Sequence, residues 1–422
     1  TWVRMKIRNS SFFWLPQVGL LVFPLFLSAC NDGAGSSRGD EVEVYDSAGI
    51  VVVSTPPSLA RRQLDWEVGP VARLNLGSIL GPVETGFSRI RGIDRLGSGD
   101  WLVLDRDDPF IRIFNDEGEI KRTDGREGEG PGEYRSPYLI PSPDSDSIFI
   151  YDVRLHRFST LNDEGIFSGV GRPAVLVRGR PVGVFQGGVL IRQSTWFLSS
   201  RPGIVESPIE YFISDRQMGS YVPLPEVPPK KEFRAYEDSW VEGVGPVSRV
   251  MGIPFQTETV AAVTRGGVLL TSSENTEVRE FGVDGDLKRI FRIDEPLRRL
   301  ESEEFLTIAE VLSRDAPDPA SDLAEYKRMP IPALVPAFSE MIVDDMGWCW
   351  AQVYDPLPNN PDQWAVFDDV GAAQGTVTTP AELDVRKIGA DFIAGVVVDS
   401  LGVPTVRIHD LLRGPKGPPS GR

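Results

Sequence analysis

From Phe87 onward, hydrophobic and polar positions form a unit that recurs along the chain. In its clearest copy, "DWLVLDRDDPFIRIFNDEGEI" (100–120), two apolar runs are separated by a charged turn and followed by an Asp/Gly turn. β-Branched and aromatic residues favour strands, and Asp, Asn and Gly tolerate the backbone angles of tight turns. Each copy therefore predicts two adjacent strands. The later copies are 147–167, 188–221, 267–287, 347–372 and 391–411.

A further short strand precedes each pair and another follows each Asp/Gly turn, so one unit predicts four antiparallel strands. Four such strands in about 40–50 residues are typical of a propeller blade. The six copies predict an all-β fold, a six-bladed β-propeller over 42–413. The last copy ends after its third strand, and we expect 66–77 to supply the closing outer strand. The run 42–53 predicts a small hairpin packed outside.

One segment between the fourth and fifth copies, 297–338, departs from this pattern and predicts a short, partly helical insertion. Ser302 is the expected N-cap of a first helix, and a second short helix is expected over 319–328. The insertion either packs against the propeller or forms a lid over one mouth of its channel. The apolar residues at helical spacing are Phe305, Ile308, Val311 and Leu312.

The first 29 residues predict a lipoprotein signal peptide. A basic start is followed by an apolar stretch, broken by prolines and too short for a good membrane span, that ends in "LSAC" at 27–30. This resembles a bacterial lipobox, in which Cys30 is lipidated. The alternatives are an ordinary secretory signal or a weak membrane anchor. We expect a flexible tether over 30–41, a disordered tail over 414–422, and attachment to the membrane through Cys30 in the bacterial cell envelope, on its periplasmic or outer-surface side.

The net charge of −17 argues against a nucleic-acid partner, because phosphate neutralisation needs Lys and Arg. The two cysteines and two histidines show no zinc-ligand spacing. No metal ligand and no cofactor are therefore assigned. A calcium site built from Asp and Asn oxygens stays open. We expect a monomer with a protein or carbohydrate ligand.

The stretch "GREGEGPGEYRSP" (125–137) is rich in glycine, as phosphate-binding loops are. Its glycines do not have the G-x-G-x-x-G spacing, the prolines that follow forbid a helix, and the Lys-Ser/Thr of a P-loop is missing. A similar "GPVETGF" at 81–87 also precedes a predicted blade. The stretch is interpreted as a crossover between blades. Arg126 and Glu133 are candidate ligand contacts, because such crossovers can line a channel mouth.

Three aspartates, Asp105, Asp152 and Asp399, end the second strand of their repeat, and an arginine follows on the third. The simpler interpretation is a turn-capping carboxylate with a nearby guanidinium. The alternative is a ring of carboxylates that binds Ca²⁺ or supplies general bases. Gln193 and Ser273 hold the equivalent places in two other repeats, so a complete ring is not expected.

Taken with the lipobox and the repeats, the chain resembles the bacterial six-bladed β-propeller lipoproteins, which are related to the NHL-repeat propellers. The resemblance implies a fold and an envelope location rather than a reaction, and no catalytic residue is assigned. The first hypothesis is a lipid-anchored binding or interaction scaffold. The alternative is a metal-dependent hydrolase or lyase, gluconolactonase-like, with its site at the channel mouth. The marks of the resemblance are "DSAGIVVV" (46–53), "GREGEGPGEY" (125–134), "VFDDVG" (366–371) and "DSLGVPTVRIHDLLR" (399–413).

Overall fold

The fold is described from a computed structural model of the 422-residue chain. The expected signal peptide, Cys30 and the tether up to residue 40 lie outside the described residues, as does the tail from residue 415. Residues 81–85 of the second "GP" turn also lie outside them. The described residues are 41–77, 86–107, 110–143, 146–172, 179–194, 203–217, 219–241, 245–314, 316–357 and 360–414.

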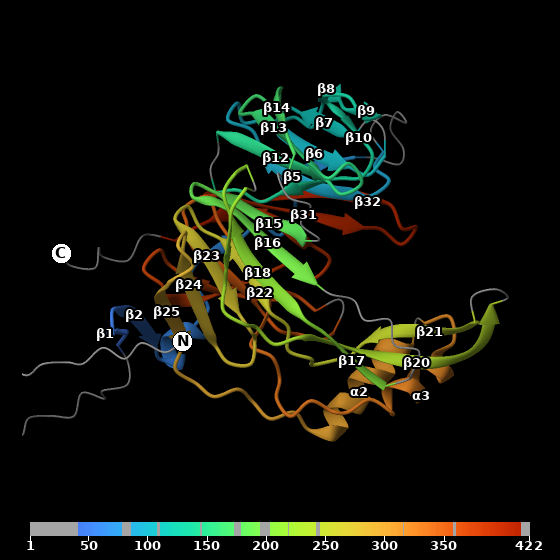
Figure 1. Ribbon diagram of the computed structural model, residues 1–422. Coiled ribbons are helices and arrows are strands. Elements are labelled where there is room, and N and C mark those ends of the chain that lie inside the picture. Colours follow the sequence, from blue (N-terminus) through green and yellow to red (C-terminus); the bar gives the residue numbers. More distant parts are fainter. Residues whose placement is uncertain are drawn as a thin grey trace, which may run out of the picture. The chain divides into compact units, whose positions relative to one another are not determined.

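The described residues are mostly β-strand, arranged in antiparallel meanders that follow one another along the chain (Figure 1). Sheet 1 contains β5 (Ile90–Arg95), β6 (Trp101–Asp105), β7 (Ile111–Phe114) and β8 (Ile120–Asp124). Sheet 2 contains β11 (Pro137–Ile140), β12 (Ser147–Asp152), β13 (Arg157–Asn162) and β14 (Phe167–Gly171). Sheet 3 contains β15 (Gly179–Phe185), β16 (Gly188–Ser194), β18 (Ile209–Ser214) and β19 (Tyr221–Pro223).

Two of the later three sheets, sheets 4 and 6, include strands from the N-terminal part of the described chain. Sheet 4 contains β22 (Val260–Val263), β23 (Gly267–Thr271), β24 (Glu277–Gly282), β25 (Leu287–Ile293), β2 (Ile50–Thr55) and β1 (Glu43–Ser47). Sheet 5 contains β26 (Phe338–Val343), β27 (Cys349–Val353), β28 (Asp362–Phe367) and β29 (Ala373–Thr379). Sheet 6 contains β30 (Asp384–Ile388), β31 (Phe392–Val398), β32 (Pro404–Leu412), β4 (Leu74–Leu76) and β3 (Glu67–Val68).

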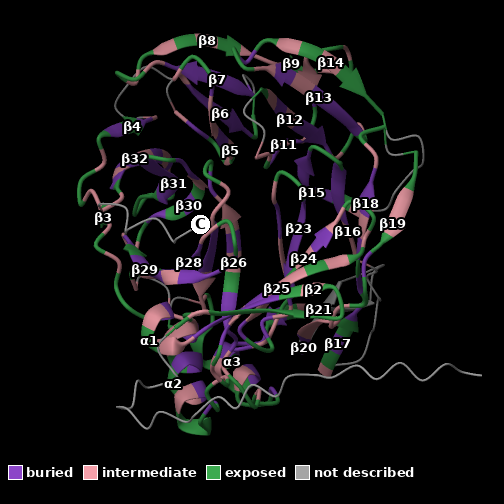
Figure 2. Ribbon diagram, turned by 90° about the vertical axis from the view of Figure 1, so that its left-hand side faces the viewer, coloured by how far each residue is buried: buried purple, intermediate pink, exposed green. Residues whose placement is uncertain are grey.

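In sheet 1, burial falls toward the outer edge. Every residue of β6 and β7 is buried, whereas β8 at the outer edge alternates between half-buried and exposed residues (Figure 2). Apolar faces of successive sheets pack on each other: Trp101 of sheet 1 meets Phe392 of sheet 6 edge-on, with ring centroids 4.8 Å apart. Such face-to-face burial removes the apolar runs of each repeat from water.

The first strands of the six sheets contact one another in chain order: β5 with β11, β11 with β15, β15 with β22, β22 with β26 and β26 with β30. Strand β30 in turn contacts β5. The first strands thus lie side by side although they come from residues 90 to 388.

The outer strand β32 of sheet 6 is paired on its free side by the chain's early residues. Val406 lies opposite Leu76 and Ile408 opposite Leu74, and Glu67 pairs with Leu412 at the other end of β32. The hairpin of β1 and β2 adds to sheet 4 in a similar way, with β2 parallel to β25. Both outer edges are therefore covered by strands distant in sequence.

Two features differ from the sequence expectation. The copy at 188–221 does not form one sheet, because β17 (Gly203–Ser207) leaves it and pairs with β20 (Lys230–Val241), which pairs with β21 (Gly245–Gly252). Ser302 is also not an N-cap, since it is the first residue of α2 (Ser302–Ser313), and Glu301 before it makes no side-chain cap bond. The acidic residues of that first turn stabilise the helix end electrostatically instead.

The helices α2 and α3 (Pro319–Tyr326) lie beside β20 and β21, at the lower right of Figure 1. Phe305 and Ile308 of α2 share one apolar cluster with Phe233 and Met251 of that ribbon. Asp318 caps α3 by accepting from the backbone N–H of Ser321 at 3.1 Å. The short elements that complete the chain are α1 (Pro57–Ala60), β9 (Arg126–Glu127) and β10 (Glu133–Tyr134).

Candidate ligand-binding cavity

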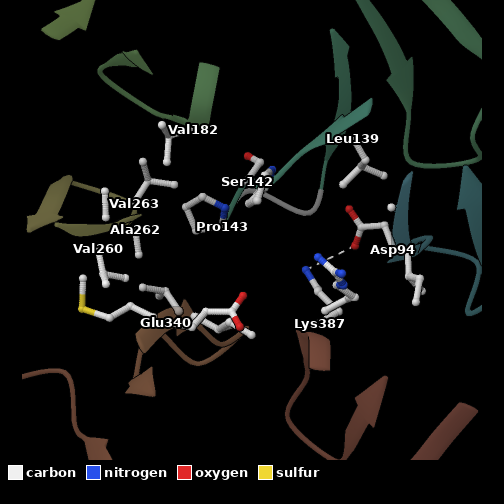
Figure 3. A pocket seen from close by; sticks show the side chains of 18 of the residues that line it. Asp94, Leu139, Ser142, Pro143, Val182, Val260, Ala262, Val263, Glu340 and Lys387 are labelled. Carbon is white, nitrogen blue, oxygen red and sulfur yellow. Dashed lines mark ion pairs between the residues drawn. The ribbon is translucent and has the colours of Figure 1, made fainter. Parts of the chain in front are cut away.

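A cavity of about 470 Å³ lies where the first strands meet (Figure 3). We call it the inner cavity. Its walls are largely apolar, and a few charged groups interrupt them. Residues of all six first strands line it, among them Ile93 (β5), Leu139 (β11), Val182 (β15), Ala262 (β22), Met341 (β26) and Lys387 (β30).

The lysine of the inner cavity is neutralised by two carboxylates. Lys387 Nζ lies 3.2 Å from an oxygen of Asp94 and 3.0 Å from one of Asp345, and Figure 3 shows the pair with Asp94. Burial by itself lowers the pKa of Lys387, but these two carboxylates outweigh it and hold the pKa above its ordinary value. The lysine therefore stays charged, and its charge is balanced within the protein.

Glu340 is another ionisable side chain of this cavity, and it points into it opposite Lys387 (Figure 3). Burial is the main cause that raises the pKa of Glu340 to about 7. The positive charge of Arg386 acts to lower this pKa, and the carboxylates of Asp384 and Asp362 act to raise it. Among the described residues, its carboxyl has no hydrogen-bond or ion-pair partner. A carboxyl with such a pKa can exchange a proton near neutral pH.

A second, larger cavity of about 990 Å³ adjoins the inner one, and the two share Arg91, Gly92, Val182 and Arg386. It lies toward the beginnings of the first strands β5, β11, β15 and β30. We call it the arginine mouth, because the described residues of its wall include five arginines and one acid, Asp384. These are Arg89, Arg91, Arg180, Arg192 and Arg386.

The sequence-predicted aspartates Asp105 and Asp152 do not line either cavity, but they hold residues that do. Both are buried. The carboxylate of Asp105 accepts from the backbone N–H groups of Ser88 and Arg89 at 3.0 and 2.8 Å, and from Arg112 at 3.0 Å. That of Asp152 accepts from the N–H of Ser136 at 3.1 Å. They hold the backbone beside the arginine mouth.

The third aspartate, Asp399, is exposed and caps its own turn by accepting from the N–H groups of Leu401 and Val403, both at 2.9 Å. It is not joined to Asp105 or Asp152. No group of three or more His, Cys, Asp or Glu side chains that could hold a metal occurs within the described part of the chain.

The glycine-rich stretch builds a closed turn away from both cavities. Strands β9 and β10 pair in parallel, and Glu133 accepts from the backbone N–H of Gly130 and from Arg126, both within 2.8 Å. A Cβ on Gly128 would lie 2.1 Å from the Glu133 carboxylate, so any other residue there would displace that side chain. The candidates Arg126 and Glu133 therefore pair with each other, and neither lines the inner cavity or the arginine mouth.

Sequence reasoning missed the arginines and Glu340. The arginines are up to three hundred residues apart in the chain, and each by itself looks like an ordinary solvent-exposed side chain. One signal was present: Arg89 directly precedes the first strand β5, and Arg180 is the second residue of the first strand β15, so these two occupy similar places in different repeats.

No protein-family model and no curated protein match the chain. It resembles solved structures of propeller-like proteins at very low identity. A protein of Bacteroides fragilis named as an exported protein is 12% identical, with a TM-score of 0.43 over 86% of this chain and 100% of that one. A DUF4221-family protein of Bacteroides vulgatus is 12% identical, with a TM-score of 0.44 over 84% and 100%. A gluconolactonase of Xanthomonas campestris is 10% identical, with a TM-score of 0.34 over 83% and 96%.

Within the described residues, no helix has both the length and the apolar character needed to cross a membrane. The likeness to solved structures is too distant to carry an argument about activity.

Proposed function

We propose that the chain is a six-bladed β-propeller that serves as a binding scaffold, with its ligand site formed by the inner cavity and the arginine mouth. One observation carries the proposal: six first strands, distant in sequence, contact one another in chain order and all contribute residues to one cavity. Propellers place their ligand sites at such a channel. The meander topology of sheets 1 to 6 supports the blade count.

The cavity has the dimensions and chemistry of a small-molecule site. Pockets of about 300–1,000 Å³ with mainly apolar walls and a few converging polar groups are the usual binding sites of such ligands. The inner cavity and the arginine mouth, at about 470 and 990 Å³, fall within that range. The charged side chains of Asp94, Glu340 and Lys387 interrupt the apolar walls of the inner cavity.

The test is to close the passage between the two cavities. Val182 is half-buried and lines both, so Val182→Trp should narrow their connection. We expect at least one probe among citrate, maltotriose and tetralysine to raise the Tm of the wild-type protein, and Val182→Trp to remove that rise. Val250→Trp, at an exposed position outside both cavities, is the matched control. A Tm that no probe raises, or a rise that Val182→Trp leaves intact, contradicts the proposal.

We further propose that the protein is exported to the bacterial cell envelope and anchored by lipid at Cys30. The basic, apolar and small-residue order that ends in "LSAC" supports this. Cys30→Ala should move the protein from the membrane fraction to the soluble fraction of the envelope. A variant that stays in the membrane fraction contradicts lipid anchoring.

The second candidate is a hydrolase or lyase, and Glu340 favours it, because a half-buried carboxyl with a pKa near 7 suits general acid–base catalysis. Gluconolactone hydrolysis with added Ca²⁺, Mn²⁺ or Zn²⁺ tests it. Turnover that is lost in Glu340→Gln supports the enzyme. If none of the three metals supports turnover and none changes the Tm, the hypothesis of a metal-dependent enzyme is rejected.

A further inference from the structure

The arginine mouth concentrates positive charge in a strongly acidic protein. The chain carries a net charge of −17, yet this cavity has five arginines and one carboxylate in its wall. The arginines come from four different strands or their flanks in three sheets: Arg89 and Arg91 from β5, Arg180 from β15, Arg192 from β16 and Arg386 from β30. Folding therefore assembles the charge, and no local run of basic residues explains it.

Four of these arginines have no carboxylate partner among the described residues. Within the described residues, Arg89, Arg91, Arg180 and Arg192 form no side-chain ion pair, whereas Arg386 pairs with Asp384. The Nε atom of Arg192 is buried and has no hydrogen-bond partner. A buried donor without a partner costs free energy, and the protein retains this one beside an open cavity.

The arginines also repel one another. Burial, followed by the like charges of Arg89, Arg106 and Arg180, lowers the pKa of the Arg91 guanidinium. Asp105 holds the backbone of Arg89, so the cluster is kept in place by the fold in spite of this repulsion. A cluster of like charges that lowers the stability of the folded protein and is nevertheless present is typical of a ligand site rather than of a structural contact.

The remaining wall shows what kind of molecule fits. Apolar side chains share the cavity with the arginines, among them Pro137, Tyr138, Val182 and Val396. An inorganic ion would leave that surface unused. The volume of about 990 Å³ suits an organic molecule with several anionic groups on a common body. Planar guanidinium groups match carboxylate, sulfate and phosphate oxygens with two parallel hydrogen bonds.

We propose that the arginine mouth binds a small organic polyanion, with carboxylate, sulfate or phosphate groups held by Arg89, Arg91, Arg180 and Arg192. This inference rests on the proposed function and names the ligand class of the same site. Because Lys387 of the inner cavity is paired with two carboxylates, and Glu340 carries no positive charge in either protonation state, the unpaired positive charge among the described residues of the site lies at this mouth.

The test is calorimetric titration of the full-length protein in detergent with citrate, inositol hexakisphosphate and a sulfated heparin tetrasaccharide, which separate carboxylate, phosphate and sulfate sources. At least one should bind, and more weakly as salt is added. Arg180→Gln should weaken binding roughly tenfold, and Arg89→Gln with Arg180→Gln roughly a hundredfold. The matched control is Arg265→Gln, which removes the same charge from an exposed turn after β22 that lines neither cavity.

A stability readout separates a ligand site from a structural cluster. If repulsion dominates, Arg180→Gln has a Tm equal to or above that of the wild type while its affinity falls. A variant with a lower Tm, or one with unchanged affinity, overturns the inference. A different result separates the inference from the proposed function. If none of the polyanions binds, but maltotriose or tetralysine binds and Val182→Trp abolishes that binding, then the inference is wrong and the proposed function stands. If no probe of any class binds, both are wrong.

Discussion

Arg413 joins the last sheet to the beginning of the fold, and its removal should destabilise the whole protein. Its guanidinium lies 2.7 Å from a carboxylate oxygen of Asp344, whose side chain is completely buried. It donates to the backbone oxygens of Gly389 and Ala390 at 2.9 and 3.1 Å. It also stacks over Trp66, 4.8 Å from the ring centroid. Arg413→Ala deletes all of these contacts at once.

The size of this destabilisation depends on the buried carboxylate of Asp344, which loses its ion-pair partner. Removing one partner of a buried ion pair costs about 3–5 kcal/mol, because the other charge stays buried. Asp344 keeps hydrogen bonds from Trp350 Nε1 at 2.9 Å and from the N–H of Trp348 at 2.8 Å. The loss should therefore lie near about 3 kcal/mol. With an unfolding entropy of about 2.1 cal/mol/K per residue over 42–413, this corresponds to a Tm lower by about 4 °C.

Scanning calorimetry of Arg413→Ala and Arg126→Ala side by side provides the measurement. Arg126 also forms a close ion pair, with Glu133, but its side chain is 77% exposed. An exposed pair contributes about 0–1 kcal/mol, so this control should lose about 1 °C or less. The reasoning is refuted if Arg413→Ala falls no further than Arg126→Ala.

Three further predictions concern single side chains. Gly128→Ala places a Cβ 2.1 Å from the Glu133 carboxylate and should cost about 1–3 kcal/mol in urea denaturation; an unchanged midpoint would show that the turn is not as tightly packed as described. Asp105→Ala removes a buried carboxylate that accepts hydrogen bonds from an arginine and from several N–H groups, so it should lower the free energy of unfolding by about 3–5 kcal/mol. Asp399→Ala, at an exposed turn, should lower it by about 0.5–1 kcal/mol. Equal losses of stability in the two variants would argue against the burial of Asp105. Because the folded-state pKa of Glu340, about 7, lies above its ordinary 4.5, the folded state binds the proton more tightly, so this group's contribution to stability is full below pH 4.5 and is lost as the pH rises toward 7. Glu340→Gln should remove that part of the pH dependence of unfolding, and an identical slope in both proteins would contradict the raised pKa.

The strand repeats could be predicted because each meander carries its own turn residues and apolar runs. Copies such as 100–120 and 147–167 coincide with strand pairs of one sheet, β6 with β7 and β12 with β13. Local sequence determines such hairpins. The β17 strand could not be assigned in this way, because "GIVES" has the same alternation as a blade strand and its partner, β20, comes more than twenty residues later.

The candidate site was less accessible to sequence reasoning. The sequence predicts Asp105 and Asp152 as turn-capping residues, and each accepts from N–H groups of the turn that follows it. Each also accepts from an N–H group just before a first strand, and through that backbone it affects the cavity. Glu340 follows another polar residue, Ser339, in β26, so the order of polar and apolar positions does not mark it as a cavity residue. Only the convergence of six first strands places it in a cavity, and that convergence is a tertiary property.

Hydrogen–deuterium exchange of the full-length protein, with and without inositol hexakisphosphate, tests the central claim most directly. The account predicts slower exchange at the beginnings of β5, β15 and β30, which line the arginine mouth, and unchanged exchange in the 125–135 turn and in β20. Slower exchange in that turn or in β20, with none at the three first strands, would contradict it.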